Sequence, residues 1–511
     1  MDMDRKERQI CLKDLVIFDS LKVGPVKICK DKISAPYTIM LKSGVTHTNE
    51  LTYHYGEEVF SPDNPADINL ASMIAVQVAL NYGLFSEVII FDGWFDKDDK
   101  KFIQDMMDNT SKEIYVMKFL HHNPFLLKPF NNPITERRRT YTAARIEFVN
   151  SAFPTMKTEG REWNTNRDKH CVLSSGGKDS LLTYGILKEI GREVHPIFIN
   201  ESGRHWFTAL NGFRYLHSTD QNTAKVWCNS DRIFNWILKH MPFIRRDFSA
   251  IRSDEYPIRL WTVAVFIFGV LPIVKKREIG RLLIGDEYDC TDRKKYRGIQ
   301  HYNGLYDQSI YFDRTITHYF FKKKWSVSQF SILRSLSEIL IMKILGTRYP
   351  HLQRNQVSCH AAHSENERIW PCGKCEKCRR IIAMMLALRL NPATCGYSEN
   401  LVKNAISRIQ TDKVNQLKSD AGHLYYLLIR ENIIPESSPL IKYAKSNPPT
   451  THLRFDRERS LLSVIPPDMR NQILELYLKY ADGALIRTKH KWEKIHILNT
   501  PEIHIPVTTK V

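Results

Sequence analysis

The stretch SSGGKDS at residues 174–180 places two glycines beside a lysine, just before a helical pattern. A strand that turns through Ser-Gly-Gly into a helix aims backbone N–H groups and the positive end of the helix dipole at one point. The serine hydroxyls add donors, and Asp179 is suited to hold Mg²⁺ against phosphates. We therefore predict a phosphate-binding loop in which Lys178 and Asp179 are catalytic. Its members are Ser174, Ser175, Gly176, Gly177, Lys178, Asp179 and Ser180.

A Walker A loop is a different arrangement and does not fit this stretch. That motif, G-x-x-x-x-G-K-[ST], has one glycine directly before the lysine and another glycine five residues earlier. Here that position is Val172, and Lys178 is followed by Asp179 instead of Ser or Thr. The chemistry of a P-loop kinase is therefore not expected.

Four of the ten cysteines form the pattern C-x12-C-x2-C-x2-C. Two-residue spacings let consecutive thiolates reach one tetrahedral centre, and the distant cysteine closes the site. The pattern predicts structural zinc, with an iron–sulfur cluster as the alternative. His360 and His363 lie between the cysteines, but four thiolates suffice and we interpret both as bystanders. The predicted zinc ligands are Cys359, Cys372, Cys375 and Cys378.

A second polar group, in the stretch NESGRHW, follows the next predicted strand. We assign Glu201 and Arg204 to substrate binding, since a guanidinium binds a carboxylate or phosphate in two places. His205 is a candidate general acid or base. The alternative is a loop with a capping serine and a packed tryptophan.

Two acidic residues, Asp286 and Glu287, end a further predicted strand. One of them is suited to hold Mg²⁺ beside Asp179, or to remove a proton from a carbon next to an activated carboxylate. We assign Asp286 to substrate binding and Glu287 to catalysis.

The elements around these residues alternate between strand and helix. We expect strands at 170–174, 193–202 and 281–287, and a helix at 180–191. Such alternation predicts an α/β fold with a doubly wound parallel sheet, whose ligands lie at the carboxyl ends of the strands.

The chain divides into three predicted parts. Residues 1–155 form an N-terminal α/β accessory domain, and residues 165–395 form the domain with the loop and the cysteines. Residues 396–511 are expected to be a mostly helical extension.

Composition limits the partners. The 511 residues carry a formal net charge of +18, with lysines and arginines scattered along the chain. We favour an anionic small-molecule substrate over nucleic acid. The apolar run at 260–274 is shorter than the roughly 20 residues of a membrane helix. With no secretory signal visible, we expect a cytoplasmic protein without a membrane partner; the oligomeric state is left open.

The loop resembles the PP-loop of the N-type ATP pyrophosphatases, whose pattern is Ser-Gly-Gly-x-Asp-Ser. In that superfamily, which has a HUP-like fold, the loop grips the leaving pyrophosphate while a substrate attacks the α-phosphate. The resemblance implies ATP and Mg²⁺ as cofactors and AMP and pyrophosphate as products.

A PP-loop followed by a four-cysteine knuckle resembles two groups. One is 7-cyano-7-deazaguanine synthase, which adenylates a carboxylate and converts it through an amide to a nitrile. The other is the UDP-N-acetylmuramoyl-L-alanyl-L-glutamate epimerase group, which adenylates a terminal glutamate of a cell-wall precursor so that its α-carbon can be inverted. Transfer of sulfur to tRNA is a further PP-loop reaction, but it would need a second reactive cysteine pair.

Three features favour the epimerase group: a domain before the loop, the stretch GDEYDCTDRKKYRGIQHYNGLYDQSIYFD at 285–313, and WPCGKCEKCRRIIAMMLAL at 370–388. The stretch NESGRHWFTALNGFRYL at 200–216, Ser175 in place of a third glycine, and residues 396–511 depart from that group. The resemblance therefore implies carboxylate adenylation more firmly than it implies the substrate.

Overall fold

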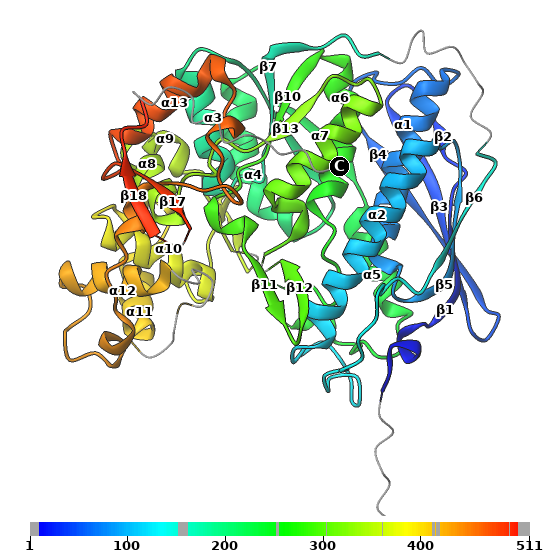
Figure 1. The fold of residues 1–511 in the computed structure, drawn as a ribbon, viewed down its shortest axis with the longest axis horizontal. Helices are drawn as coiled ribbons and strands as arrows, with labels where there is room; N and C mark the ends of the chain where they lie inside the picture. The colour runs from blue at the N-terminus through cyan, green and yellow to red at the C-terminus, as the bar shows by residue number, and fades with distance from the viewer. Residues whose placement is uncertain are drawn as a thin grey trace, which may run out of the picture.

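The computed structural model describes residues 10–151, 162–251, 255–302, 304–359, 361–410, 414, 420–489 and 491–498. A mixed sheet of 11 strands runs through the molecule in the order β13-β10-β7-β8-β9-β4-β3-β1-β5-β6, with β2 paired to β3 (Figure 1). Its strands are β1 (Phe18–Val23), β2 (Lys27–Ile28), β3 (Lys32–Leu41), β4 (Thr46–His54), β5 (Ser86–Asp92), β6 (Arg145–Val149), β7 (Asn166–Leu173), β8 (Glu193–Asn200), β9 (Ala224–Cys228), β10 (Ile279–Leu283) and β13 (Ser328–Phe330).

Helices cover the sheet and build the C-terminal region. They are α1 (Pro65–Val76), α2 (Lys97–Ile114), α3 (Lys178–Glu189), α4 (Arg204–Thr219), α5 (Ser230–Lys239), α6 (Val263–Lys276), α7 (Ile310–Lys322), α8 (Glu338–Arg348), α9 (Pro350–Gln353), α10 (Glu376–Ala387), α11 (Glu399–Ile409), α12 (Ala421–Arg430) and α13 (Pro467–Leu478). Three smaller sheets pair β11 (Arg293–Tyr296) with β12 (Ile299–Tyr302), β14 (His363–Glu365) with β15 (Arg368–Trp370), and β17 (Ala484–Thr488) with both β16 (Leu453–Phe455) and β18 (Lys491–Ile495).

Five neighbouring strands, β9-β8-β7-β10-β13, run parallel to one another. From β7 the chain proceeds to β8 and β9 on one side and later returns to β10 on the other. The order of strands therefore reverses between β7 and β10. In open α/β sheets, such a switch point leaves a crevice at the carboxyl ends of the two strands, where ligands bind.

Helices pack on both faces of these parallel strands. Successive side chains of a strand point to opposite faces, and β7 sends Cys171 into one core and Val172 into the other. Helices α6 and α7 share the core of Cys171, whereas α3, α4 and α8 share that of Val172. The predicted α/β class and the two-sided cover of helices are confirmed, but the complete sheet is mixed.

The apolar run at 260–274 belongs mostly to α6, a 14-residue helix whose side chains are largely buried. In the described part of the chain, no helix has the length and apolar character needed to cross a membrane.

The N-terminal strands extend the same sheet. Strand β4 pairs antiparallel with β9, so the sheet crosses the predicted division near residue 160 without interruption. A buried cluster also joins the two parts: the ammonium group of Lys323, just after α7, lies 2.8 Å from Asp99 on α2 and 2.9 Å from Asn69 on α1. The domain boundaries themselves stay a prediction.

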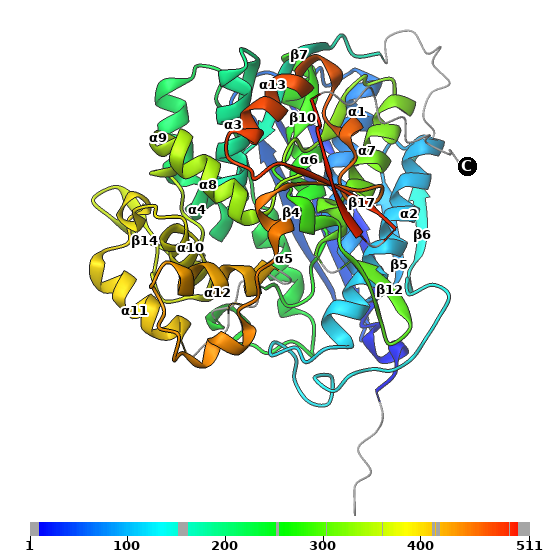
Figure 2. The same ribbon diagram turned by 60° about the vertical axis from the view of Figure 1, so that its left-hand side comes forward.

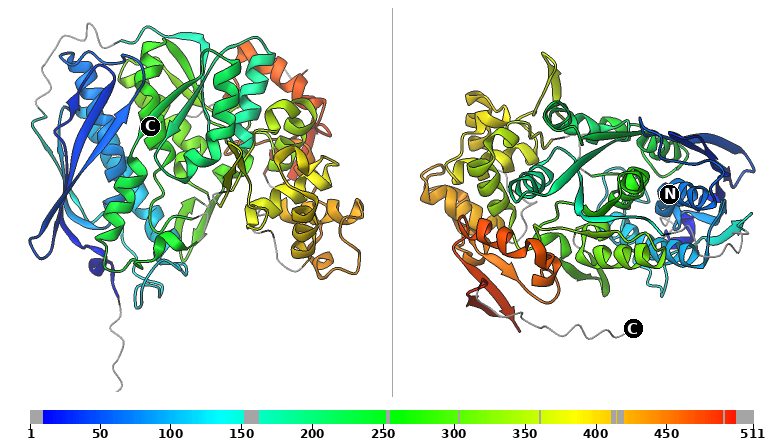
Figure 3. Two further views of the ribbon diagram at one scale, coloured as in Figure 1. Left: turned by 180° about the vertical axis from the view of Figure 1, so that it is seen from behind. Right: turned by 90° about the horizontal axis from the view of Figure 1, so that it is seen from above.

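The C-terminal region lies at the end of the molecule opposite the N-terminal strands (Figures 1 and 3). It contains the helices α11, α12 and α13 and also the three-stranded sheet β16-β17-β18. Helix α13 lies beside α3 (Figure 2), and Asp468 at its start accepts two hydrogen bonds from Arg281 of β10, at 2.7 and 2.8 Å. Apolar residues between Leu453 and Ile497 share the core of the parallel strands.

Candidate functional site

The loop at 174–180 leaves β7 and enters α3 at the switch point. Gly176 has a positive φ of 69°, and a Cβ added there would lie 2.8 Å from the Cα of Ala209 on α4. Gly177 precedes α3 and has no side chain to cap it. The loop backbone is therefore held against α4, and the positive end of α3 opens at the carboxyl edge of the sheet.

The two glycines give a test of this geometry. We expect Gly176→Ala to lower the free energy of unfolding by about 2 kcal/mol or more, because left-handed backbone disfavours a side chain and the added methyl meets α4. Gly177→Ala is the control: its φ is −83°, and an added Cβ meets only the Ser175 hydroxyl, at 3.4 Å. Urea unfolding measures both. Equal effects of the two variants would contradict the loop geometry.

The serines of the loop divide into two kinds. Ser174 and Ser180 are buried, and their hydroxyls bond each other at 3.2 Å, while the Ser180 hydroxyl also donates to the carbonyl of Gly177 at 3.1 Å. Ser175 is exposed. Two serines therefore shape the loop, and the third is available to a ligand.

Lys178 is buried among carboxylates. Its ammonium group lies 2.8 Å from Asp179 and 3.3 Å from Glu338 at the start of α8. Burial alone would lower the pKa of Lys178, but Asp179, Glu338 and Glu287 raise it well above its usual range. The lysine is therefore a fixed cation.

Glu338 joins this lysine to the cysteine region. The second Glu338 oxygen lies 3.3 Å from the guanidinium of Arg380 on α10. Burial raises the pKa of Glu338, yet Arg380 and Lys178 together bring it below its usual value. Two consecutive ion pairs therefore connect the loop, through Glu338 on α8, to Arg380 on α10. The sequence analysis did not predict either Glu338 or Arg380 as part of the site.

The four predicted zinc ligands come together at the start of α10. The sulfur atoms of Cys359, Cys372, Cys375 and Cys378 all lie within 4.8 Å of one another. The sulfurs of Cys372 and Cys378 are 3.8 Å apart, which is about the separation that Zn–S bonds of 2.3 Å give in a tetrahedron. Backbone N–H groups point at these sulfurs, including that of Cys372 toward Cys359 at 3.2 Å.

The cluster thus fits a metal ion such as zinc, held by four thiolates. His363 is exposed on β14, outside the cluster, and His360 lies outside the described residues. Cys375 and Cys378 lie at the start of the helix that carries Arg380. The metal centre is therefore also placed to fix the position of Arg380, the last residue of the two ion pairs.

The strand β10 brings the two predicted carboxylates to the loop. A Cβ added at Gly285 would lie 2.7 Å from the Cβ of Asp179, so the end of β10 passes directly against the loop. Burial raises the pKa of Glu287 to about 7, helped by the carboxylates of Asp179 and Glu338 and opposed by Lys178. The Glu287 carboxyl therefore holds a proton more readily than an ordinary glutamate.

Asp286 is almost completely buried. One of its carboxylate oxygens lies 3.3 Å from the guanidinium of Arg334, which also binds Asp313 at 2.7 Å. The other has no hydrogen-bond partner in the described structure. Burial raises the pKa of Asp286 well above its usual range. Its position favours support of the loop and of Glu287 over direct contact with a substrate.

The residues at the end of β8 form a second group. Glu201 is buried, and one of its oxygens accepts the N–H groups of His205 and Trp206 at 2.8 and 3.1 Å, which caps α4. Burial raises the pKa of Glu201 to about 7. His205 Nε2 is 2.5 Å from the hydroxyl of Tyr256, and Arg204 is exposed.

A hollow of about 110 Å³ opens beside this group, lined by residues that include Arg204, Asp231, Asn235 and Tyr256. It lies near the loop, because Ala209, which contacts Gly176, is only one helical turn, about 6 Å, from His205. The structure therefore gathers Lys178, Asp179, Asp286 and Glu287 at one point and places Glu201, Arg204 and His205 next to it as a separate group.

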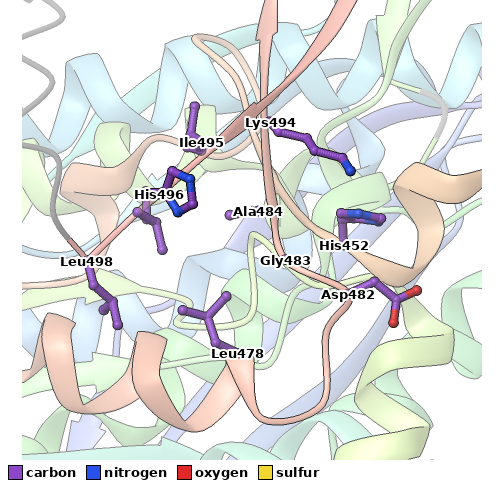
Figure 4. A pocket seen from close by; sticks show the side chains of 10 residues that line it. His452, Leu478, Asp482, Gly483, Ala484, Lys494, Ile495, His496 and Leu498 are labelled. Atoms are coloured by element: carbon purple, nitrogen blue, oxygen red, sulfur yellow. The ribbon is translucent and has the colours of Figure 1, made fainter.

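Another hollow, of about 340 Å³, lies between α13 and β18 (Figure 4). Lys494, His452 and Asp482 are on one side of it, and the apolar side chains of Leu478 and Leu498 on the other. It contains none of the residues gathered at the loop.

We compared the chain with models of known protein families and with curated proteins, and neither comparison gives a match. Any assignment of function therefore rests on the motifs and on the geometry of the site.

Proposed function

We propose that the protein binds ATP at the loop and transfers AMP to a substrate carboxylate, with release of pyrophosphate. The observation that carries this proposal is the convergence of SSGGKDS and the acidic end of β10 at the switch point between β7 and β10. A phosphate loop that faces carboxylates, without a hydroxyl after its lysine, suits a pyrophosphate leaving group and a bound Mg²⁺.

In the proposed step, an oxygen of the substrate carboxylate attacks the α-phosphorus and the bond from that phosphorus to the β-phosphate oxygen breaks. An acyl adenylate and pyrophosphate result. The N–H groups at the start of α3 and the charge of Lys178 stabilise the departing pyrophosphate. Asp179 would hold Mg²⁺, which neutralises phosphate charge when bound.

The fate of the adenylate follows from the neighbouring groups. We favour epimerisation of the terminal L-glutamate in a UDP-N-acetylmuramoyl-dipeptide-like substrate, because Glu287 has a pKa of about 7 and is suited to take a proton from the α-carbon. The alternative is attack by ammonia on an adenylated deazapurine carboxylate, as in 7-cyano-7-deazaguanine synthase.

The test uses both substrates with ATP and hydroxylamine, which traps acyl adenylates as hydroxamates. We expect a hydroxamate from UDP-N-acetylmuramoyl-L-alanyl-L-glutamate and, in D₂O, deuterium at its glutamate α-carbon. A hydroxamate from 7-carboxy-7-deazaguanine alone would favour the alternative. Hydroxamate from the dipeptide substrate, together with no deuterium at the α-carbon in a parallel reaction without hydroxylamine, would exclude epimerisation.

The pKa of Glu287 predicts the pH dependence. A carboxyl group can act as a base only when it is ionised, so the rate should rise as pH passes through about 7 and fall about tenfold per unit below pH 6. Rate profiles of kcat from pH 5 to 9 measure this. Glu287→Gln should abolish the fall of kcat at low pH, the acidic limb, and should also remove most of the rate. His205→Asn should keep the acidic limb. Loss of the limb in the histidine variant would assign the base to His205.

A further inference from the structure

A cationic surface lies on the hairpin formed by β11 and β12. The hairpin projects between the N-terminal half of the molecule and the C-terminal region (Figure 1). We define the hairpin surface as Arg137, Arg139, Lys295 and Arg297 together with the rings of His121 and Tyr296. The four cationic residues and His121 are exposed, and Tyr296 is half-buried.

The turn of the hairpin brings two chain segments together. Tyr296 pairs with Ile299, so Arg297 and Gly298 form a two-residue turn, and both have positive φ, as a type I′ turn requires. A Cβ added at Gly298 would lie 2.9 Å from the guanidinium of Arg137. Arg137 is therefore in contact with the tip of the hairpin, and Arg139 follows two residues later in the same segment.

The four cations are available to a partner. Within the described residues, none of them forms an ion pair. Nearby carboxylates are already paired: Glu136 with Arg138 at 2.5 Å, and Glu255 with Lys118 at 3.0 Å. The surface therefore has an uncompensated positive charge, in a chain whose formal net charge is +18.

An aromatic platform lies beside Arg297, on the face of the hairpin opposite to Lys295, because successive side chains of a strand point to opposite faces. The rings of His121 and Tyr296 are 4.0 Å apart between centroids, and the Arg297 guanidinium lies 5.7 Å from the Tyr296 centroid. Bases of a single strand stack on such rings and on guanidinium groups, while phosphates bind the surrounding cations. A polyanion without aromatic bases would bind only to the cations and would make no use of the rings.

We propose that the hairpin surface binds single-stranded nucleic acid, with phosphates on the four cations and a base on the His121–Tyr296 platform. RNA and DNA share this chemistry. The hairpin begins six residues after Glu287, a distance of at most about 20 Å. The binding residues Tyr296 and Arg297 lie three to four residues further along the hairpin, and the proposal does not rest on the reaction proposed above.

The experiment measures fluorescence anisotropy of labelled 20-nucleotide U-RNA, T-DNA and a mixed-sequence duplex between 50 and 200 mM salt. The test variant is Arg137→Gln with Lys295→Gln and Arg297→Gln. The control is Lys27→Gln with Lys276→Gln and Lys403→Gln, which removes the same charge from three other exposed lysines.

We expect the test variant to weaken single-strand binding at least about tenfold and to reduce the salt slope by about 2, since each lost phosphate contact contributes about 0.7. The control should change affinity less than about twofold, and His121→Ala should weaken it about fivefold. Preference for RNA over DNA, or the reverse, would identify the partner.

Several results would overturn the proposal. They are no binding by the unaltered protein at 50 mM salt, equal loss in test variant and control, tighter binding of duplex than of either single strand, and equally effective competition by poly-L-glutamate. Circular dichroism of each variant checks that the fold is retained.

Discussion

Lys178→Ala is expected to reduce ATP-dependent turnover by about a hundred- to a thousandfold, because it removes the fixed cation that faces the departing pyrophosphate. The same change leaves Glu338 and Asp179 without their common partner. We therefore also expect weaker ATP binding, measured by isothermal titration with the non-hydrolysable analogue AMPCPP.

Lys188→Ala is the matched control on the same helix. Lys188 stands near the end of α3, its side chain is 45% exposed, and it pairs with Asp220 at 3.2 Å, away from the loop. It should keep full turnover and ATP affinity. If Lys178→Ala retained turnover while folding normally, the active site would lie elsewhere.

Cys378→Ser has the second large expected effect. It replaces one of four thiolates, so the bound metal should fall well below one ion per chain, as measured by atomic emission of the purified protein. Because structural metal binding contributes folding energy, we expect the free energy of unfolding to fall by about 3 kcal/mol or more. ATP affinity should also fall, since Arg380 follows Cys378 on α10 and contacts the partner of Lys178.

Cys395→Ser is the control for this change. Cys395 is buried in the same core as the cluster, but it is not one of the four grouped sulfurs. It should keep the metal and ATP affinity. Iron and sulfide in place of zinc would support the iron–sulfur alternative, and a full complement of metal in Cys378→Ser would contradict the four-thiolate site.

Local patterns predicted the parts of the site that neighbouring residues build. The strand before SSGGKDS and the helix after it lie within a few residues of the predicted ranges, because an apolar run and two glycines define both. The cysteine spacing predicted the cluster for the same reason: three of its four members lie within seven residues.

Partners that are distant in the sequence could not be predicted in this way. Glu338 follows the capping Ser337, so its position looks like an ordinary helix start, and its contact with Lys178 depends on the packing of α8 against α3. Arg334 is almost fully buried, although a single arginine between Leu333 and Ser335 gives no sign of which carboxylates it will meet. The antiparallel pairing of β4 with β9 likewise joins strands about 170 residues apart.

The central claim is that ATP is cleaved between its α- and β-phosphates at this loop. The most direct measurement is to incubate the protein with Mg²⁺, UDP-N-acetylmuramoyl-L-alanyl-L-glutamate or 7-carboxy-7-deazaguanine, and ATP labelled with ³²P at the α-phosphate, and to separate the labelled products. We predict labelled AMP with an equal amount of pyrophosphate, and neither product in Lys178→Ala. Labelled ADP with free phosphate, unchanged in Lys178→Ala, would contradict the assignment.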